Sequence, residues 1–496
     1  MREEDTSTGS GHVVVVGGGI AGLAAAHRLL GGGARVTVLE ASDRVGGKLL
    51  PGEIAGARVD LGAESMLARR PEAVDLAREV GLGDRLQAPA TATASLWNRG
   101  ALIPMPKGHV MGVPGTASAL AGVLSDEGLR RVERDADLPR TEVGDDIAVG
   151  EYVAARLGRE VVDRLVEPLL GGVYAGDAYR ISLRLAVPQL YAAARGHTSL
   201  TEAVREIQAK AATAGQTGPV FMGIDGGVGR LPLAVAESVT ARGGEILTGT
   251  PVTALRRTAA ADPATGGRPR AAWRVVAGDR VLDADAVVLA LPAPAAAALL
   301  RAESPAAADE LAAVEYASMA LVTLAYRSAD ITLPEGSGFL VPPVDGHTIK
   351  AATFASRKWG WIADRNPGLT VLRTSVGRHG ETEVLGRPDA DLVRVSRHDL
   401  REATGLDTDP VETLVTRWDD GLPQYPVGHH ARVARVRDHV GRLPGLVVCG
   451  AAYDGVGIPA CIASAYAAVD GLRGDTEGLD ALRAAPVQSL HGGAGE

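Results

Sequence analysis

The sequence predicts an α/β protein built around a parallel sheet, and three observations near the N-terminus carry this prediction. Residues 13–16 are a valine run, the pattern of a strand that is buried on both faces. A glycine-rich turn at 17–22 with G-x-G-x-x-G spacing follows, and 20–30 is an alanine- and leucine-rich helical segment. A second apolar strand, 35–39, ends in Glu40. This order predicts a Rossmann-type dinucleotide-binding unit, and a purely structural glycine loop is the alternative.

The turn and the acidic residue after the second strand have the chemistry of a nucleotide site. Gly17 permits a tight turn, Gly19 lets the backbone approach a pyrophosphate, and Gly22 lets the helix pack against the strand. The helix N-terminus adds free N–H groups and a positive dipole end. Glu40 is placed to bind ribose hydroxyls and would repel the 2′-phosphate of NADP, which leaves FAD and NAD. The residues expected at this end of the cofactor are Gly17, Gly18, Gly19, Ile20, Ala21, Gly22 and Glu40.

The bulk composition is that of a globular protein with two or three domains. The chain has 496 residues, 46% hydrophobic and 22% charged, and its net charge of −9 argues against a nucleic-acid-binding surface. Two cysteines, Cys449 and Cys461, indicate buried thiols in a reducing cytoplasm rather than a disulfide framework. Residues 1–11 lack a signal-peptide pattern and, with 476–496, are expected to be disordered tails. No apolar run is long enough to span a membrane.

A second glycine-rich segment favours FAD over NAD. After Glu40 the doublet Gly46-Gly47 lets the backbone turn close to a ligand, while Arg44 and Lys48 offer cations to a phosphate. The arrangement resembles the two-dinucleotide-binding flavoproteins, and residues 60–65 resemble their segment that lies along the flavin. The further cofactor residues expected here are Ala41, Arg44, Gly47, Lys48, Gly62, Ala63, Glu64 and Ser65.

Four longer motifs resemble the protoporphyrinogen and coproporphyrinogen oxidases, which are FAD enzymes of haem biosynthesis. They are Leu-Ile-Pro-Met-Pro-Lys-Gly at 102–108, Glu-Pro-Leu-Leu-Gly-Gly-Val-Tyr-Ala-Gly-Asp at 167–177, Pro-Gln-Tyr-x-x-Gly-His at 423–429 and Gly-Ala-x-Tyr-Asp-Gly-Val-Gly-Ile-Pro-x-Cys-Ile at 450–462. The resemblance implies further FAD contacts at Val252, Trp418, Gly450, Ala451, Val456, Gly457 and Ile458.

The resemblance also implies an α/β multi-domain fold of the amine-oxidase-like flavoprotein kind. The FAD-binding domain is expected to be discontinuous, at 12–85, 220–290 and 440–475. A helical insertion is expected at 86–212 and a mixed-sheet substrate domain at 291–435.

Two parts of the chain give their own periodic signals. Apolar residues recur every four positions between 145 and 170, at Val153, Leu157, Val161, Leu165 and Leu169, which predicts one long helix facing a core. Strands of the substrate-domain sheet are predicted at 321–326, 338–341, 349–354 and 370–376. Lys350, Arg357, Lys358 and Arg373 are the cations of this region, and surface solvation is the default explanation for each.

The function implied by the resemblance is the oxygen-dependent, six-electron oxidation of coproporphyrinogen III to coproporphyrin III with release of hydrogen peroxide. Flavin N5 would accept hydride, so no catalytic side chain is expected, and the histidines show no metal-ligand spacing. Coproporphyrinogen carries four propionates and protoporphyrinogen IX two. The position of the propionate-binding arginine of the eukaryotic protoporphyrinogen branch is Ala94 here, which weakens the two-propionate mode.

The substrate contacts are hypotheses at Arg70, Lys107, Tyr174 and Arg373. Ser375 stands where firmicute relatives carry a tyrosine, so their pocket does not transfer unchanged. Protoporphyrinogen IX oxidase is the first alternative, and another amine-oxidase-like flavoenzyme or a non-catalytic flavoprotein is the more distant one. The expected partners are a porphyrinogen and dioxygen, without nucleic acid. Candidate additional contacts are the next haem-pathway enzyme and a membrane surface. The protein is expected to be a monomer or a homodimer and to lie in the cytoplasm.

Overall fold

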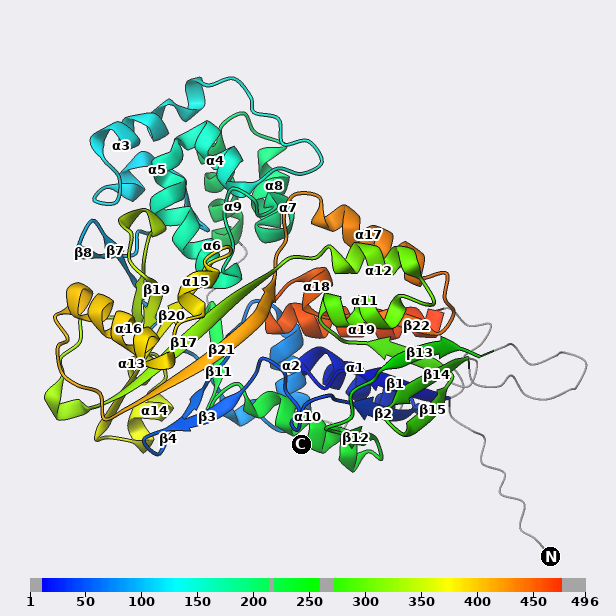
Figure 1. Cartoon of the computed structure of the whole chain (residues 1–496). Coiled ribbons are helices and arrows are strands. Elements are labelled where there is room, and N and C mark those ends of the chain that lie inside the picture. The colour runs from blue at the N-terminus through cyan, green and yellow to red at the C-terminus, as the bar shows by residue number, and fades with distance from the viewer. Residues whose placement is uncertain (1–10, 214–217, 259–271, 475–496) are drawn as a thin grey trace, which may run out of the picture.

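The structure, a computed structural model, describes residues 11–213, 218–258 and 272–474 (Figure 1). The tails expected to be disordered therefore lie outside the described residues, apart from Gly11, which is buried and accepts a hydrogen bond from the Arg35 amide. Figure 1 shows a helical part at the top, a large, mostly antiparallel sheet at the left and a parallel sheet at the lower right.

The parallel sheet confirms the predicted α/β class. Its five strands run in the order β12-β2-β1-β16-β22, and all neighbouring pairs are parallel. Every residue of β1 and β16 is buried, as expected for apolar central strands that are covered on both faces. The strands are β1 (His12–Val16), β2 (Arg35–Leu39), β12 (Glu245–Leu247), β16 (Ala286–Leu289) and β22 (Leu446–Val448).

Two layers cover the faces of the parallel sheet, and each closes its own apolar core. One layer is helical and the other combines a small antiparallel sheet with three helices. The helical layer consists of α1 (Ile20–Gly31), α2 (Pro71–Glu79), α10 (Arg230–Ala241) and α19 (Ile458–Gly474). The second layer consists of β13 (Ala254–Arg257), β14 (Trp273–Ala277), β15 (Arg280–Ala284), α11 (Ala293–Leu300), α12 (Pro305–Ala312) and α17 (His429–Val440).

A seven-stranded sheet forms the second part, in the order β21-β17-β20-β19-β18-β7-β8. All neighbours are antiparallel except β18 and β7. Helix α16 (Asp389–Thr404) packs on the outer face through Leu392 and Leu400. The strands are β7 (Ser95–Asn98), β8 (Ala101–Pro104), β17 (Tyr316–Arg327), β18 (Gly338–Leu340), β19 (Ile349–Thr353), β20 (Leu369–Val376) and β21 (Glu412–Pro423).

The helical part departs from the prediction of one long helix between 145 and 170. Gly158 adopts a left-handed conformation (φ 94°) and ends the first segment, and a π-helical turn follows at 162–166. The apolar stripe still reaches one core, because each segment turns its valines and leucines inward. The helices of this part are α3 (Asp126–Glu133), α4 (Val149–Leu157), α5 (Arg159–Val161), α6 (Glu167–Tyr174), α7 (Leu183–Ala186), α8 (Pro188–Ala194) and α9 (Leu200–Thr213).

The parts do not follow the expected sequence ranges at three places. Strands β7 and β8, inside the range 86–212 expected for the helical insertion, complete the edge of the seven-stranded sheet. Helices α11 and α12, inside the range 291–435 expected for the substrate domain, and α17, which begins inside that range at His429 and ends at Val440, pack on the parallel sheet, because their apolar faces fit its second core. No helix within the described ranges is long and apolar enough to cross a bilayer.

Candidate flavin and substrate site

The glycine-rich turn at the end of β1 is tight on one side and open on the other. A Cβ atom on Gly22 would lie 1.9 Å from the carbonyl oxygen of Gly17, and one on Gly17 would lie 2.4 Å from that of Ala290. A Cβ atom on Gly19 would meet nothing within 4 Å. The first two glycines are therefore required by packing, whereas Gly19 faces free space beside the N-terminus of α1, where a pyrophosphate can approach the backbone.

The second glycine-rich segment lies directly on this turn. The Gly46 amide donates to the Gly18 carbonyl at 2.8 Å, and Gly19 and Gly46 form a parallel bridge. Arg44 shapes the segment, because its guanidinium donates to the carbonyls of Val45 (3.3 Å) and Gly47 (2.9 Å). The two segments are separated in the sequence, but together they form one backbone surface around the open side of Gly19.

Glu40 connects this surface to the end of the parallel sheet. Its Oε2 accepts the Gly18 amide at 2.6 Å, and its Oε1 accepts the Ser42 amide and hydroxyl at 2.9 and 2.7 Å. The Glu40 carbonyl accepts the Thr250 amide at 2.8 Å, which brings the segment after β12, including Val252, to the same edge. A carboxylate oxygen has two lone pairs, so Oε2 retains one for a ribose hydroxyl.

The segment 60–65 is held by two strands of the seven-stranded sheet. Arg373 of β20 donates through Nη1 to the carbonyls of Asp60 (3.0 Å) and Gly62 (2.8 Å), and its Nη2 lies 2.9 Å from Glu64. Trp418 of β21 donates through Nε1 to the Leu61 carbonyl at 3.0 Å. A Cβ atom on Gly62 would lie 2.0 Å from the Lys48 carbonyl, so glycine is needed there. Residues 60–65 are called the flavin-side segment below, because the family resemblance implies that they lie along the flavin. This segment and the large sheet therefore form one wall.

Two buried carboxylates of this segment have opposite pKa shifts. Burial raises the pKa of Asp60 to about 6, although its two oxygens accept the amides of Val228 and Gly229. Burial alone would also raise the pKa of Glu64, but the cations of Arg373 and Lys358 together lower it to about 2. Glu64 is thus ionised under all ordinary conditions, and Lys358 Nζ lies 2.6 Å from it.

The charge of Glu64 gives a pH-dependent prediction. Its folded-state pKa of about 2 lies below the ordinary 4.5, so the ionised carboxylate stabilises the fold above about pH 4.5, and this contribution is lost as the pH falls toward about 2. We expect Glu64→Gln to lower the melting temperature at pH 7, and the difference from the wild type to shrink on acidification, as measured by melting curves from pH 7 to 3. Glu53→Gln, at an exposed position of β3 (Pro51–Ile54), is the matched control; equal effects of both variants would contradict the prediction.

The C-terminal motif closes the site beside α1. Gly450, which follows β22, has φ 118°, and its amide donates to Ser464 Oγ of α19 at 3.1 Å. A Cβ atom on Gly450 would come near only Ala21 of α1, at 3.8 Å. Through Gly450, α19 is thereby held beside the N-terminus of α1. Helix N-termini favour negative charge, because their free N–H groups and dipole are positive.

Lys48 and the two cysteines lie in this same region. Burial lowers the pKa of Lys48, and the nearby Cys461 side chain offsets part of that shift. Burial raises the pKa of Cys461 to about 12 and that of Cys449 further still. Both cysteines are buried free thiols, which confirms the sequence interpretation.

The Pro-Gln-Tyr-x-x-Gly-His motif connects the helical part to the C-terminal part of the site. Tyr425 donates its hydroxyl to the Ala451 carbonyl, and His429 Nε2 lies 2.9 Å from the Ala452 carbonyl. Gln424 donates to the Tyr174 carbonyl at 2.9 Å, and the rings of Tyr174 and Tyr425 meet edge to face at 5.8 Å. The motif therefore sets the position of α6, which carries Tyr174, relative to the residues that follow β22.

The candidate substrate residues are not gathered at one point. Tyr174 is half-buried beside Tyr425, and burial raises its pKa to about 12. Arg70 is half-exposed and ion-paired with Glu72 at 2.6 Å, whereas Lys107 is exposed in the helical part of the molecule. The donors of Arg373 are occupied by the 60–64 segment.

Sequence reasoning missed the partners that fix the site. Surface solvation holds for none of the four cations of this region: Arg373 is bound to the 60–64 segment, and the other three have partners as well. Lys350 is 5% exposed and donates to the Gly377 carbonyl at 2.8 Å, Lys358 binds Glu64, and Arg357 donates to the carbonyls of Leu333 and Pro334. Their spacing along the chain carries no signal, because each partner lies on a remote segment.

The residues present fit a bound FAD. Three glycines show the space that a cofactor would need. A Cβ atom on Gly19 would meet nothing within 4 Å, one on Gly450 would meet a single atom at 3.8 Å, and one on Gly457 would meet a single atom at 3.9 Å. These openings lie beside the uncapped N-terminus of α1, while Gly17, Gly22 and Gly62 have no room for a side chain. Open backbone beside helix N-termini is suited to a pyrophosphate and a flat ring.

The chain belongs to the flavin containing amine oxidoreductase family, whose model matches residues 20–472. Its cofactor is accordingly FAD. Within that family it is one of the porphyrinogen oxidases. It is 39% identical to the coproporphyrinogen III oxidase of Mycobacterium tuberculosis, over 94% of this chain and 98% of the relative, and 33% identical to that of Bacillus subtilis, over 93% and 98%.

Solved structures agree with this placement. A candidate protoporphyrinogen oxidase from Exiguobacterium sp. 255-15 superposes with a TM-score of 0.81 at 32% identity, covering 93% of this chain and 98% of that chain. Putrescine oxidase, at 15% identity, superposes with a TM-score of 0.65 over 94% and 99% of the two chains, which shows a shared fold alone.

Proposed function

We propose that the chain oxidises coproporphyrinogen III to coproporphyrin III, with FAD as hydride acceptor, dioxygen as the final acceptor and hydrogen peroxide as product. One observation carries the proposal: Arg373 and Trp418 project from the large sheet onto the backbone of the flavin-side segment. The sheet that would bind substrate is thereby fixed to the segment that would lie along the flavin. The coproporphyrinogen III oxidases among the relatives support the choice of substrate.

The inner face of the large sheet supports a flat substrate next to this wall. Met319, Ala351 and Ser375 are half-buried although β17, β19 and β20 are central strands, so other parts of the chain do not pack tightly over them. The C-terminal half of α6 faces the edge of this surface, where a Cβ atom on Gly172 would lie 3.7 Å from Leu340. A macrocycle bound there would contact mostly apolar or small side chains.

The protein groups contribute by position rather than by acid or base chemistry. When bound, FAD supplies the hydride acceptor, and the hard electron chemistry belongs to it. Arg373 and Trp418 hold the segment 60–64 in place, and the glycine-rich segments hold the phosphates. We propose the cofactor contacts named from the sequence as its binding residues, with Tyr174 as a wall of the substrate site.

The direct test is an anaerobic titration of the purified holoenzyme with coproporphyrinogen III. We expect bleaching of the flavin absorbance, and under air the appearance of coproporphyrin and hydrogen peroxide. Protoporphyrinogen IX oxidation is the second candidate, since the Exiguobacterium structure carries that name. We expect kcat/KM to be higher for coproporphyrinogen III, and the reverse order would favour the second candidate. A flavin that stays oxidised with both substrates would reject the proposal.

The cationic side chains proposed for propionate contact give a separate prediction. We expect Arg70→Gln or Lys107→Gln to raise KM for coproporphyrinogen III about two- to fivefold, because an exposed charge pair contributes little binding energy. The effect on the two-propionate substrate, protoporphyrinogen IX, is expected to be smaller. Arg69→Gln is the matched control, because Arg69 is an exposed neighbour of Arg70. An unchanged KM for both substrates would remove these residues from the site.

For the setting of the reaction we propose the cytoplasm and a monomer or homodimer. The next enzyme of the haem pathway and a membrane surface are the proposed transient contacts. Light scattering of the purified protein, and its co-sedimentation with anionic vesicles, test the assembly and the membrane contact.

A further inference from the structure

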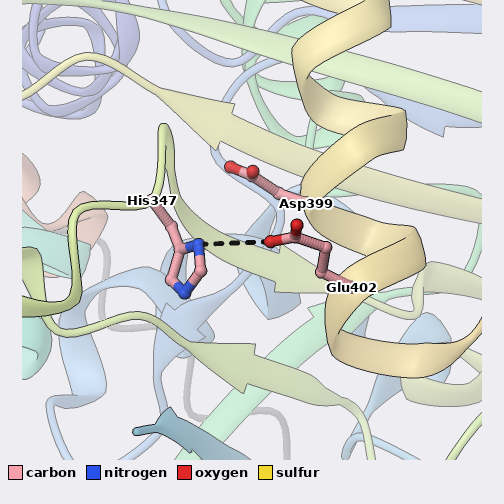
Figure 2. A group of neighbouring side chains, drawn as sticks. All are labelled: His347, Asp399 and Glu402. Carbon is pink, nitrogen blue, oxygen red and sulfur yellow. Dashed lines mark ion pairs between the residues drawn. The ribbon is translucent and has the colours of Figure 1, made fainter. Parts of the chain in front are cut away.

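Three side chains with metal-ligand chemistry meet on the outer face of the large sheet, away from the flavin-side segment. They are His347, from the loop before β19, and Asp399 and Glu402 of α16 (Figure 2). One ring nitrogen and one carboxylate oxygen from each acid lie within 4.8 Å of one another, and His347 Nδ1 is 3.8 Å from Glu402 Oε2. From this geometry we propose a binding site for a borderline divalent cation such as Zn²⁺.

Two of the three side chains, His347 and Asp399, are held in place by neighbours. The His347 ring stacks on Trp97 with centroids 3.5 Å apart and planes inclined by 15°. Asp399 is 4% exposed, and its Oδ2 accepts the amides of Thr348 and Ile349, both at 2.9 Å. Spacing of three residues on one helix brings Asp399 and Glu402 to the same face. The ligands are therefore largely arranged before any ion binds.

The charges around the site favour a bound cation. Within the described ranges, neither Asp399 nor Glu402 forms an ion pair with a lysine or an arginine. Oδ1 of the buried Asp399 accepts no hydrogen bond in the same part of the chain. Glu402 instead faces two imidazoles, from His347 and, at 3.2 Å, from His398. Among the described residues, Asp399 therefore has backbone amides but no cationic side chain as partners, Glu402 has only imidazoles, and a cation between the two carboxylates would offset the repulsion of their like charges.

The donor set selects the class of metal. One imidazole nitrogen and two carboxylate oxygens suit Zn²⁺ and related borderline ions, whereas Mg²⁺ and Ca²⁺ prefer oxygen alone. Glu402 is 45% exposed, which leaves room for water in the remaining positions. The alternative without metal is an ion pair between Glu402 and protonated imidazoles.

A metal here would reinforce the contact between the large sheet and the helical part. The loop that carries His347 also carries Asp345, which accepts the Arg99 amide at 3.0 Å and lies 3.1 Å from Arg164 Nη1. An ion that joins His347 to α16 would fix this loop from one side while Arg164 holds it from the other. The site is accordingly structural, distant from the hydride transfer.

The test is isothermal titration of the EDTA-treated, dialysed holoenzyme with Zn²⁺, with Mg²⁺ as the comparison ion. We expect one Zn²⁺ per chain, and His347→Ala and Glu402→Gln to weaken its binding at least about tenfold. His197→Ala is the matched control: His197 also contacts a glutamate, Glu206, but Lys210 already neutralises that carboxylate. Its Zn²⁺ affinity is expected to equal that of the wild type.

A stability measurement gives a second readout. Zn²⁺ is expected to raise the melting temperature of the wild type and of His197→Ala, because a ligand that binds the folded state stabilises it, but to leave that of Glu402→Gln unchanged. Stoichiometric binding lost in both site variants supports the metal site. Absence of Zn²⁺ binding by the wild type, or equal affinity in His347→Ala and wild type, would overturn it. None of these outcomes depends on porphyrinogen oxidation.

Discussion

Replacing Arg373 by methionine is expected to lower the melting temperature strongly and to yield protein with little bound flavin. The substitution removes the donors to the carbonyls of Asp60 and Gly62 and leaves Glu64 with Lys358 as its only cationic partner among the residues that the structure describes. Breaking one side of a buried charge pair costs about 3 to 5 kcal/mol. Melting curves and the ratio of flavin to protein absorbance measure the two effects.

The same experiment decides between two roles for Arg373. If its role is to hold the flavin-side segment, we expect Arg373→Lys to restore little of the flavin content. A single ammonium group cannot reproduce the planar guanidinium that binds three acceptors here. Arg357→Met is the matched control, since Arg357 also donates to carbonyls of the large sheet part but not to the 60–64 segment. Full flavin content in Arg373→Met together with a raised KM for porphyrinogen would instead identify Arg373 as a substrate contact.

Replacing Gly22 by alanine is expected to abolish tight flavin binding. The new Cβ atom would lie 1.9 Å from the Gly17 carbonyl oxygen, so α1 must move away from β1. Overpacking of this kind costs about 1 to 3 kcal/mol or more. Because the N-terminus of α1 moves with the helix, the phosphate-binding amides are displaced as well. Flavin content after purification and the dissociation constant for added FAD are the measurements.

Gly31 supplies the control for Gly22 within the same helix. A Cβ atom at Gly31 meets nothing within 4 Å, and alanine in a helix is favoured over glycine by about 0.5 to 1 kcal/mol. Gly31→Ala is therefore expected to keep its flavin and to melt no lower than the wild type. Equal flavin content in the two alanine variants would show that the contact between Gly17 and Gly22 does not limit cofactor binding.

Elements with strong local patterns were predictable. The strand at 35–39 has the predicted bounds, and the helix predicted over 20–30 extends to Gly31. These segments combine a clear apolar pattern with glycine boundaries, so little information from the rest of the chain is needed. The four strands predicted in the large sheet are also present, as β18, β19, β20 and the longer β17.

Features that depend on remote partners were not predictable. Strand β21, Glu412–Pro423, lacks a regular alternation of buried and exposed residues because it contacts both β17 and the flavin-side segment, and its pairing with β17 shifts register near Met319. The break at Gly158 interrupts a regular apolar stripe through a single backbone angle. The cluster of Glu64, Lys358 and Arg373 exists only in three dimensions, since its members come from three separate segments.

The strand order of the parallel sheet also affects how the protein is made. The first two strands emerge early during translation, but β22 and the N-terminus of α19 are among the last described segments of the chain. Contacts between such distant segments slow folding and expose partly folded chains. A nascent polypeptide therefore holds an incomplete nucleotide site until β22 and α19 have been synthesised.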